Sequence, residues 1–310
     1  MARSSPRLGA LLALASTACG GAPPTEIFFG AAPLRGVLPA GAWYDYYVNA
    51  TDEDSNIVFT VNATSEYANA LGIYVSDPPS TEELPDANTR SSLSPGDYLD
   101  YDTTSMIVVD GVRHYSVVVG QCYVRKGQLY YLSVFGKNAA GGPKPSVPFD
   151  VSVKRVPAAI PLTNGSITKI TGSVCDNRYM HYFWEIDSRF QSGGVRTTIS
   201  KQEGELEAAY MRYEHCAGLA GANMADVGLS GHGSPSGRVT LPMGPKPLEA
   251  GRYYVSLRGK QELCGNYEIT VEQLNQHQLL SSPAATLRAG GGVTMLLSLL
   301  PAWLLARVAR

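Results

Sequence analysis

The chain has 310 residues and a formal net charge of −2; hydrophobic residues make up 44% of it and charged residues 17%. That length suits about two domains. The absence of a run of Lys or Arg excludes nucleic-acid binding as a main function, because neutralising phosphates needs a basic stripe. Abundant Gly (32), Pro (20) and Tyr (18) favour short strands joined by turns over long helices.

Residues 1–20 have the three-part plan of a secretory signal peptide. Two arginines precede an apolar run from Leu8 to Ala18, and small residues follow it. The run is too short to cross a hydrocarbon core, which needs about 20 apolar residues. We predict a helical signal peptide cleaved after Ala18 or Gly20. The alternative is a bacterial type of lipoprotein site at Cys19.

Residues 36–156 are predicted to form a first β-sandwich module. Apolar and polar residues alternate in short segments punctuated by turn residues, which is typical of strands with one buried face. These segments are residues 44–48, 57–61, 130–137 and 149–153. A long polar insertion at 77–105 interrupts the module, and long loops on a rigid sandwich often carry binding function.

Residues 157–164 form the predicted linker, and its prolines lack the donors that a strand ladder needs. A second module is predicted at 165–274. Its alternating segments are residues 179–186, 195–199, 253–260 and 267–271. The Gly- and Ala-rich residues 217–235 correspond to the insertion of the first module.

The two modules share an internal repeat. Residues 130–137 (YYLSVFGK) and 253–260 (YYVSLRGK) have Tyr-Tyr, Ser and Gly-Lys at the same positions. A glycine suited to a turn, Gly127 or Gly251, precedes each copy, and segment 44–48 resembles segment 179–186. We therefore predict an all-β chain of two tandem antiparallel β-sandwich domains that are jelly-roll-like.

The repeat also resembles a known family. An aromatic opening strand, then Gly-x-Tyr-Tyr-[Val/Leu]-Ser-x-x-Gly, then a closing Tyr/Phe-x-[Ile/Val]-x-Val is similar to the bacterial pre-peptidase C-terminal domain, over about residues 40–272. The resemblance implies β-sandwich accessory modules without chemistry of their own. Some members of that family bind calcium or matrix polymers.

Four cysteines remain once Cys19 is set aside. An even number in an oxidising compartment predicts disulfides, and three connectivities are possible. The second module holds three of the four, so we expect one bridge within it, while its third cysteine reaches the first module or stays free. The isolated spacing gives no zinc motif. The four are Cys122, Cys175, Cys216 and Cys264.

Both the glycosylation sequons and the C-terminus indicate the cell surface. The sequons are at Asn49, Asn62 and Asn164, and the first two should point to solvent if they carry glycans. Small residues from Ser281, a spacer ending in three glycines and an apolar run at 293–306 fit a glycosylphosphatidylinositol (GPI) signal, with Ser281 as attachment site. A transmembrane tail within 281–310 is the alternative.

A search for chemistry finds no convincing catalytic motif. The loop at 228–233 lacks the second glycine of a nucleophile elbow. His215 and Cys216 are adjacent, so on a strand they would point to opposite faces. No cofactor is expected, although two acidic clusters could bind calcium instead of forming solvated turns. They are Asp52, Glu53 and Asp54, and Asp97, Asp100 and Asp102.

These observations favour a cell-surface glycoprotein with a non-catalytic binding or adhesion role. We expect an extracellular protein or glycan as partner, loops 77–105 and 217–235 as the contact surface, and attachment to the membrane by a lipid anchor or short tail. A structural coat or stalk is the main alternative. A secreted hydrolase accessory module and an enzyme with dispersed site residues are weaker ones.

Overall fold

A computed structural model gives the structure of the chain. It describes residues 24–64, 71–76, 106–109, 112–136, 146–163, 165–175, 178–187, 193–216, 227–228, 237–241, 248–260 and 263–275. The predicted signal peptide with Cys19, the C-terminal tail with Ser281, Asn164 and the acidic cluster at 97–102 lie outside these ranges. So do both predicted contact loops, except for residues 227–228.

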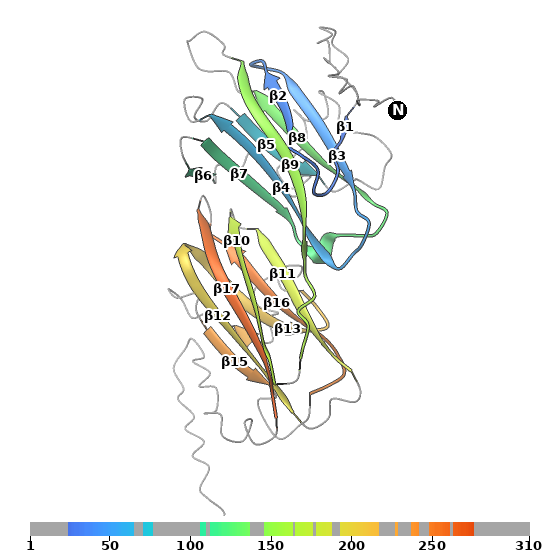
Figure 1. Cartoon of the computed structure of the whole chain (residues 1–310), viewed down its shortest axis with the longest axis vertical. Helices are drawn as coiled ribbons and strands as arrows, with labels where there is room; N and C mark the ends of the chain where they lie inside the picture. Colours follow the sequence, from blue (N-terminus) through green and yellow to red (C-terminus); the bar gives the residue numbers. More distant parts are fainter. Residues whose placement is uncertain are drawn as a thin grey trace, which may run out of the picture.

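Two β-sandwiches follow one another along the long axis of the molecule (Figure 1). In the first, the sheets have the orders β1-β3-β8-β5 and β2-β9-β4-β7-β6. The strands are β1 (Thr25–Glu26), β2 (Leu34–Leu38), β3 (Trp43–Asn49), β4 (Ser55–Thr64), β5 (Leu71–Ser76), β6 (Met106–Val109), β7 (Val112–Val119), β8 (Leu129–Gly136) and β9 (Val147–Pro157). A short 3-10 helix, η2 (Gln121–Tyr123), lies between β7 and β8.

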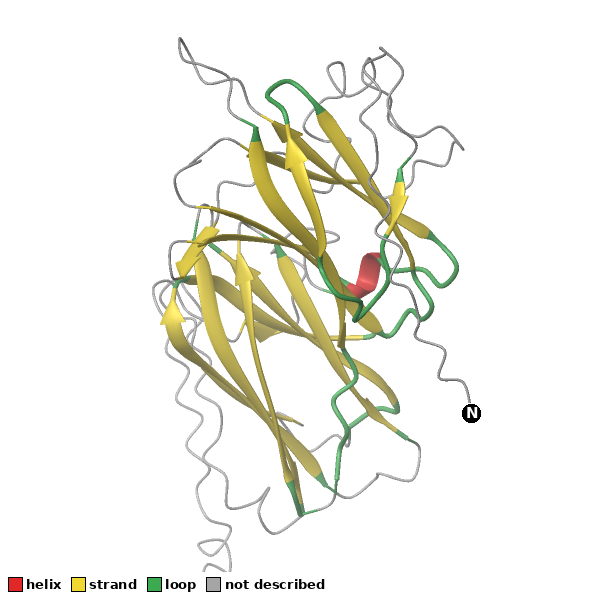
Figure 2. Ribbon diagram, turned by 45° about the horizontal axis from the view of Figure 1, so that its top comes forward, coloured by secondary structure: helices red, strands yellow, loops and turns green. Residues whose placement is uncertain are grey.

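The second sandwich has the sheet orders β10-β17-β12-β15 and β11-β16-β13-β14. Eight strands in these two orders make a jelly roll. The strands are β10 (Ile167–Cys175), β11 (Tyr179–Ile186), β12 (Gly194–Gly204), β13 (Leu206–Tyr213), β14 (Val227–Gly228), β15 (Gly237–Leu241), β16 (Gly251–Gly259) and β17 (Cys264–Leu274). In Figure 2, the regular structure of the described residues consists of strands and one short helix, η2, which lies between the sandwiches.

The internal repeat extends to the topology. The order β2-β9-β4-β7 in the first sandwich matches β10-β17-β12-β15 in the second, and β3-β8-β5 matches β11-β16-β13. The repeated sequence falls on β8 and β16, which pair with β3 and β11. A difference lies at one edge, where β6 pairs with β7 but β14 pairs with β13. The all-β, jelly-roll-like prediction is confirmed.

Each sandwich has its own core, built by alternation along the strands. On β8, Tyr130, Leu132 and Val134 are completely buried, while the residues between them face the other side of the sheet. In the second core, Trp184 is also fully buried and stacks on Tyr253 with ring centroids 4.3 Å apart. Burial of such side chains supplies most of the free energy that holds each pair of sheets together.

The two predicted turn glycines differ in their placement. Gly127 lies in a turn with φ of 81°, as the sequence predicted. Gly251 instead opens β16 with φ of 146°, in the region where residues with a Cβ are strained. A Cβ there would also collide with the carboxylate of Glu214, so the position requires glycine for packing as well.

Two disulfides join the four cysteines. Cys175–Cys264 lies inside the second sandwich, where the two residues face each other across β10 and β17. Cys122–Cys216 connects the sandwiches, with a Cα–Cα distance of 6.4 Å. Cys216 and its neighbour His215 follow the end of β13, so the expectation that they belong to a strand is wrong.

Among the residues that the structure describes, no helix combines the length and apolar character needed to span a bilayer.

Candidate functional site

The junction between the sandwiches is organised by one buried side chain, Asn56 at the start of β4. Its Oδ1 accepts hydrogen bonds from the backbone N–H of Gln121, at 2.9 Å, and of His181, at 3.1 Å. Its Nδ2 donates to the backbone oxygen of His181 at 2.8 Å and, more weakly, to that of Val156 at 3.4 Å. Asn56 therefore links β4, η2 and β11, and it is completely buried.

Apolar contacts surround this polar node. Val58 of β4 and Val118 of β7 point away from the core of the first sandwich and pack into the core of the second, together with Ile160. Because these side chains are buried between the two sandwiches, the junction is a packed interface, and the sandwiches are not tethered loosely.

The predicted linker is part of this interface. Between its prolines, Ala158 and Ile160 are almost completely buried. The N–H of Ile160 donates to Phe183 O at 2.7 Å, and the N–H of Phe183 donates to Ala158 O at 2.9 Å. The prolines thus flank a parallel bridge between Ala159 and Phe183. The prediction that the prolines would keep the linker out of a strand ladder is therefore wrong.

The first acidic cluster lies at the edge of the junction, and two of its carboxylates are paired with arginines. Asp54 accepts from Arg252 at 2.9 Å, and the Arg252 guanidinium also lies over the Phe183 ring, 4.4 Å from its centroid. Asp52 accepts from Arg155 at 2.6 Å. Although burial opposes ionisation, hydrogen bonds from Ser55 and Arg155 hold the pKa of Asp52 below its usual value. Both carboxylates thus neutralise arginines, but only the Asp54–Arg252 pair joins the two sandwiches. The calcium prediction remains a prediction.

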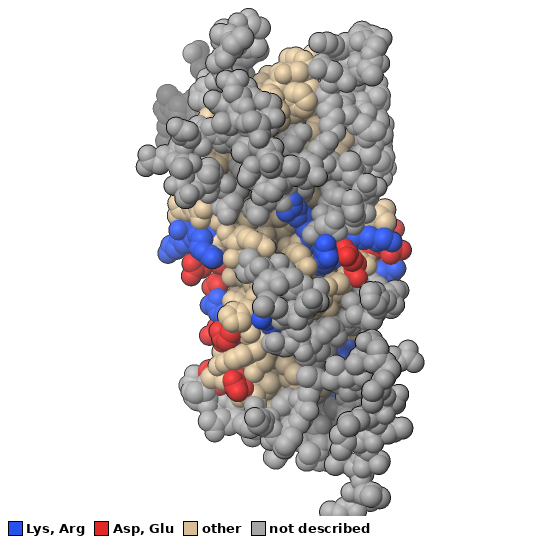
Figure 3. Space-filling model, turned by 180° about the vertical axis from the view of Figure 1, so that it is seen from behind, with Lys and Arg blue, Asp and Glu red and all other residues tan. Residues whose placement is uncertain are grey.

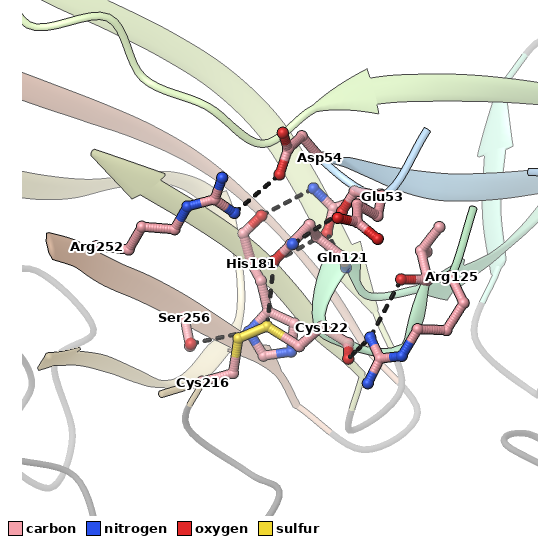
Figure 4. Close-up of a disulfide and its surroundings, with 11 residues drawn as sticks. Glu53, Asp54, Gln121, Cys122, Arg125, His181, Cys216, Arg252 and Ser256 are labelled. Carbon is pink, nitrogen blue, oxygen red and sulfur yellow. Dashed lines mark hydrogen bonds and ion pairs between the residues drawn. A yellow bond between two sulfur atoms is a disulfide. The ribbon is translucent and has the colours of Figure 1, made fainter. Parts of the chain in front are cut away.

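His181 lies at the centre of the junction, against the disulfide that joins the sandwiches (Figure 4). Its ring is fully buried, and Nδ1 is 2.8 Å from the hydroxyl of Ser256. Nε2 has no hydrogen-bond partner among the described residues. Gly120 permits this close approach, since a Cβ there would come within 2.6 Å of Cδ2 of the ring.

Burial controls the charge of this imidazole. It lowers the pKa of His181 to about 3, from an ordinary value of 6.5. The ring lies against Tyr179, Tyr123 and Ser256, which carry no charge at neutral pH. His181 is therefore neutral in the folded protein.

This neutral histidine predicts a loss of stability in mild acid. Between pH 6.5 and 3 the unfolded chain binds a proton that folded His181 does not. The contribution of neutral His181 to the free energy of unfolding is thus complete above pH 6.5. Below pH 6.5 this contribution decreases, by at most about 1.4 kcal/mol per pH unit. Urea unfolding at pH 7 and pH 5 should show the decline. His181→Gln should flatten it, whereas the half-buried His114→Gln control should retain it; an equal slope in both variants would contradict the assignment.

A second feature is an aromatic face on the outer side of β3 and β8. Alternation turns these residues away from the core, and the aromatic ones among them are half-buried. Three cross-strand pairs form the face: Trp43–Phe135, Asp45–Ser133 and Tyr47–Tyr131. We call this set the aromatic face. The Trp43 and Phe135 rings are stacked 4.6 Å apart, and the rings of the two tyrosines are 6.1 Å apart.

Polar groups lie between and beside these rings. The Ser133 hydroxyl donates to the Asp45 carboxylate at 2.6 Å, in the middle of the face. The Tyr47 hydroxyl donates to Glu26 on the neighbouring strand β1 at 3.4 Å. The aromatic face therefore combines flat apolar rings with hydrogen-bonding groups, as binding surfaces commonly do.

The equivalent pairs of the second sandwich lie at the junction. They are Tyr179–Arg258, His181–Ser256 and Phe183–Tyr254, which the repeat aligns with the aromatic face. There, the preceding sandwich and the linker cover the central residues. Even the backbone contact is repeated, because Ile27 N donates to Tyr47 O at 2.8 Å as Ile160 N does to Phe183 O. In the second sandwich, the same sheet face is thus covered by other parts of the chain.

The described sequons lie on strands of the first sandwich. Asn49 at the end of β3 is exposed, and its glycosylation remains a prediction. Asn62 on β4 points away from the core, is half-buried and has its Oδ1 2.7 Å from Nδ1 of His114.

Charged side chains do not form a patch of one sign on the side drawn in Figure 3. Described basic and acidic residues are interspersed there, mainly around the middle of the molecule and on the second sandwich. Ion pairs of the second sandwich, such as Arg196–Glu272 at 3.0 Å, likewise place opposite charges side by side.

No protein-family model matches the chain, and no curated protein is significantly similar to it. Among solved structures, a triple jelly-roll protein of an archaeal virus is 10% identical, with a TM-score of 0.21; the match covers 80% of this chain and 61% of that one. The major capsid protein P2 of bacteriophage PM2 is 10% identical, covering 78% and 98%, at a TM-score of 0.20.

A protein of Eubacterium rectale described as secreted is also 10% identical, covering 81% and 79%, at a TM-score of 0.24. The chain spans about three fifths of the archaeal virus protein's length. These TM-scores are too low to carry an argument about function, and the jelly-roll assignment rests on the strand orders.

Proposed function

We propose that the chain is a non-catalytic cell-surface protein that binds a neutral glycan on its aromatic face. The aromatic face is the observation that carries the proposal. The negative faces of aromatic rings attract the weakly positive C–H groups of a sugar, while the half-buried carboxylate of Asp45 can accept hydrogen bonds from its hydroxyls. Tyr and Trp are also the side chains that most often dominate binding energy.

The spacing of the rings supports an oligosaccharide as ligand. Trp43 and Tyr47 are four residues apart on one strand, which corresponds to roughly 13 Å. Two ring pairs at that distance with a polar pair between them can contact separate sugar units of one chain. A flat protein partner would more typically require a larger contact area with a continuous apolar centre.

Two further observations support the setting. The two disulfides fit an oxidising compartment outside the cytosol. The packed junction holds the sandwiches as one body, so that a ligand bound to the first sandwich is held at a fixed distance from Leu274 at the end of β17. We propose membrane attachment there through the GPI signal at Ser281, with loops 77–105 and 217–235 as additional contacts.

Binding to an array of immobilised neutral oligosaccharides tests the proposal. The full chain should bind a subset of them, and Trp43→Ala and Tyr131→Ala should each weaken binding roughly 30-fold or more. Tyr254→Ala is the matched control, since it changes the equivalent tyrosine of the second sandwich and should leave the affinity unchanged. Absence of glycan binding by the folded chain, or equal binding by the Trp43 variant, would overturn the proposal.

A further inference from the structure

The junction contains a set of potential metal ligands that no sequence motif indicates. One nitrogen of His181 and the sulfur atoms of Cys122 and Cys216 all lie within 4.8 Å of one another. They come from β11, from η2 and from the segment after β13, so they are far apart in the sequence. In the folded chain shown here, the two sulfurs form the disulfide between the sandwiches.

One ring nitrogen of the His181 imidazole is held by a hydrogen bond, and the other is left without one among the described residues. Metal-binding histidines usually present one ring nitrogen to the metal while a second group holds the other nitrogen. Here Ser256 holds Nδ1 at 2.8 Å, and the buried Nε2 is without a hydrogen-bond partner among the described residues. A buried polar atom left in this way requires an explanation, because it costs free energy.

We propose that, when the Cys122–Cys216 disulfide is reduced, these two cysteines and His181 Nε2 bind a zinc ion. Two thiolates and one neutral imidazole are ligands that zinc prefers. Their two negative charges also cancel the charge of Zn²⁺, which matters because an uncompensated charge is costly at a buried site. A monovalent copper ion on the same ligands would leave one net negative charge.

The conversion of the disulfide into the zinc-bound form conserves electrons and protons. A dithiol reductant gives two electrons and two protons to the disulfide and becomes a disulfide itself. Zinc then binds both sulfurs and displaces the two thiol protons to water. Cys122 is only half-buried, so reductant and metal can reach the site from its side. The Gln121 side-chain oxygen, 3.2 Å from the Cys122 sulfur, or a water can take the fourth position.

The proposal goes beyond glycan binding and does not depend on it. It gives the junction two alternative links, a disulfide under oxidising conditions and zinc under reducing ones.

The test uses the full chain, reduced with a water-soluble phosphine that is then removed. Titration with Zn²⁺ against a chromogenic chelator should show one tightly bound ion per chain. Cys175→Ala/Cys264→Ala is the matched control, because it removes the other cysteine pair and should keep that ion. Cys122→Ala should abolish tight binding, and Ser256→Ala should weaken it by roughly 10–100-fold.

Two further measurements separate the site from unspecific thiol binding. Cobalt in place of zinc should give thiolate charge-transfer absorption in the wild type and the control but not in Cys122→Ala. His181→Gln should shift the cobalt spectrum and weaken zinc binding, with near-ultraviolet circular dichroism reporting the fold of each variant. The proposal is overturned if the reduced, folded chain binds no zinc, if Cys122→Ala binds it equally, or if reduction unfolds the chain and zinc does not restore it.

Discussion

Replacing Asn56 with Ala should lower the free energy of unfolding by roughly 3–5 kcal/mol, because several buried backbone groups lose their partner at once. The N–H groups of Gln121 and His181 and the carbonyl of His181 all bind the Asn56 side chain. Each buried group left unpaired costs about 1–3 kcal/mol, and these groups are too deep for water to replace the amide without disturbing the junction.

The measurement is the midpoint of urea unfolding for the full chain. Thr60→Ala is the matched control: Thr60 lies on the same strand and the same face but is half-exposed, so its loss should cost less than about 1 kcal/mol. Asn56→Asp offers a second comparison, since a carboxylate accepts but cannot donate to His181 O. If Asn56→Ala and Thr60→Ala have equal effects, Asn56 does not organise the junction.

Removing the disulfide between the sandwiches should have the second large effect. Cys122 and Cys216 are 94 residues apart, and closing a loop of that length restricts the unfolded chain strongly. The double variant Cys122→Ala/Cys216→Ala should lose about 2–5 kcal/mol of stability. It should also weaken the coupling between the sandwiches, so that their thermal unfolding separates.

Calorimetry distinguishes these consequences. The junction variant should unfold in two resolved transitions where the wild type unfolds in one. Cys175→Ala/Cys264→Ala opens a loop of similar length within the second sandwich but keeps the link between the sandwiches, so it should lower the single transition without dividing it. One unchanged transition for the junction variant would mean that the interface, without the disulfide, is sufficient to couple the two units.

The strands with period-two alternation could be predicted from the sequence. Segment 179–186 coincides with β11, and the repeated segments lie on β8 and β16, because a strand with one buried face must alternate. Short edge strands such as β1 and β14 have only two residues each, and no periodicity can be read from two positions. They depend on the neighbours with which they pair.

The disulfide pattern could be predicted only in part. The sequence favoured one bridge within the second module and left open whether its third cysteine reaches Cys122. The structure contains the bridge within that module and the link to Cys122. Spacing alone could not choose between the alternatives, because pairing depends on which loops the sheets bring together.

The junction was missed because its residues have ordinary local explanations. Asn56 follows an acidic turn and reads as a turn residue, and His181 is one histidine among the aromatic residues of β11. Their roles arise from contacts between segments 125 residues apart in the chain. One signal was available in the sequence. His181 and Phe183 occupy outward positions of β11, and aromatic side chains at such positions favour a buried face over a solvent-exposed one.

The presence of outward-facing aromatic residues on this sheet could also be predicted from the sequence. Segment 44–48 is rich in tyrosine, and its alternation requires that some of these rings face outward. The sequence could not show that Trp43 pairs with Phe135 and Tyr47 with Tyr131, because these contacts depend on the register of β3 against β8.

Oxidative footprinting of the full chain, with and without a bound oligosaccharide, tests the central claim most directly. The account predicts that the ligand protects Trp43, Tyr47 and Tyr131 from modification while Tyr254 of the second sandwich keeps its reactivity. Protection of loops 77–105 or 217–235 with no change at Trp43, Tyr47 and Tyr131 would contradict it.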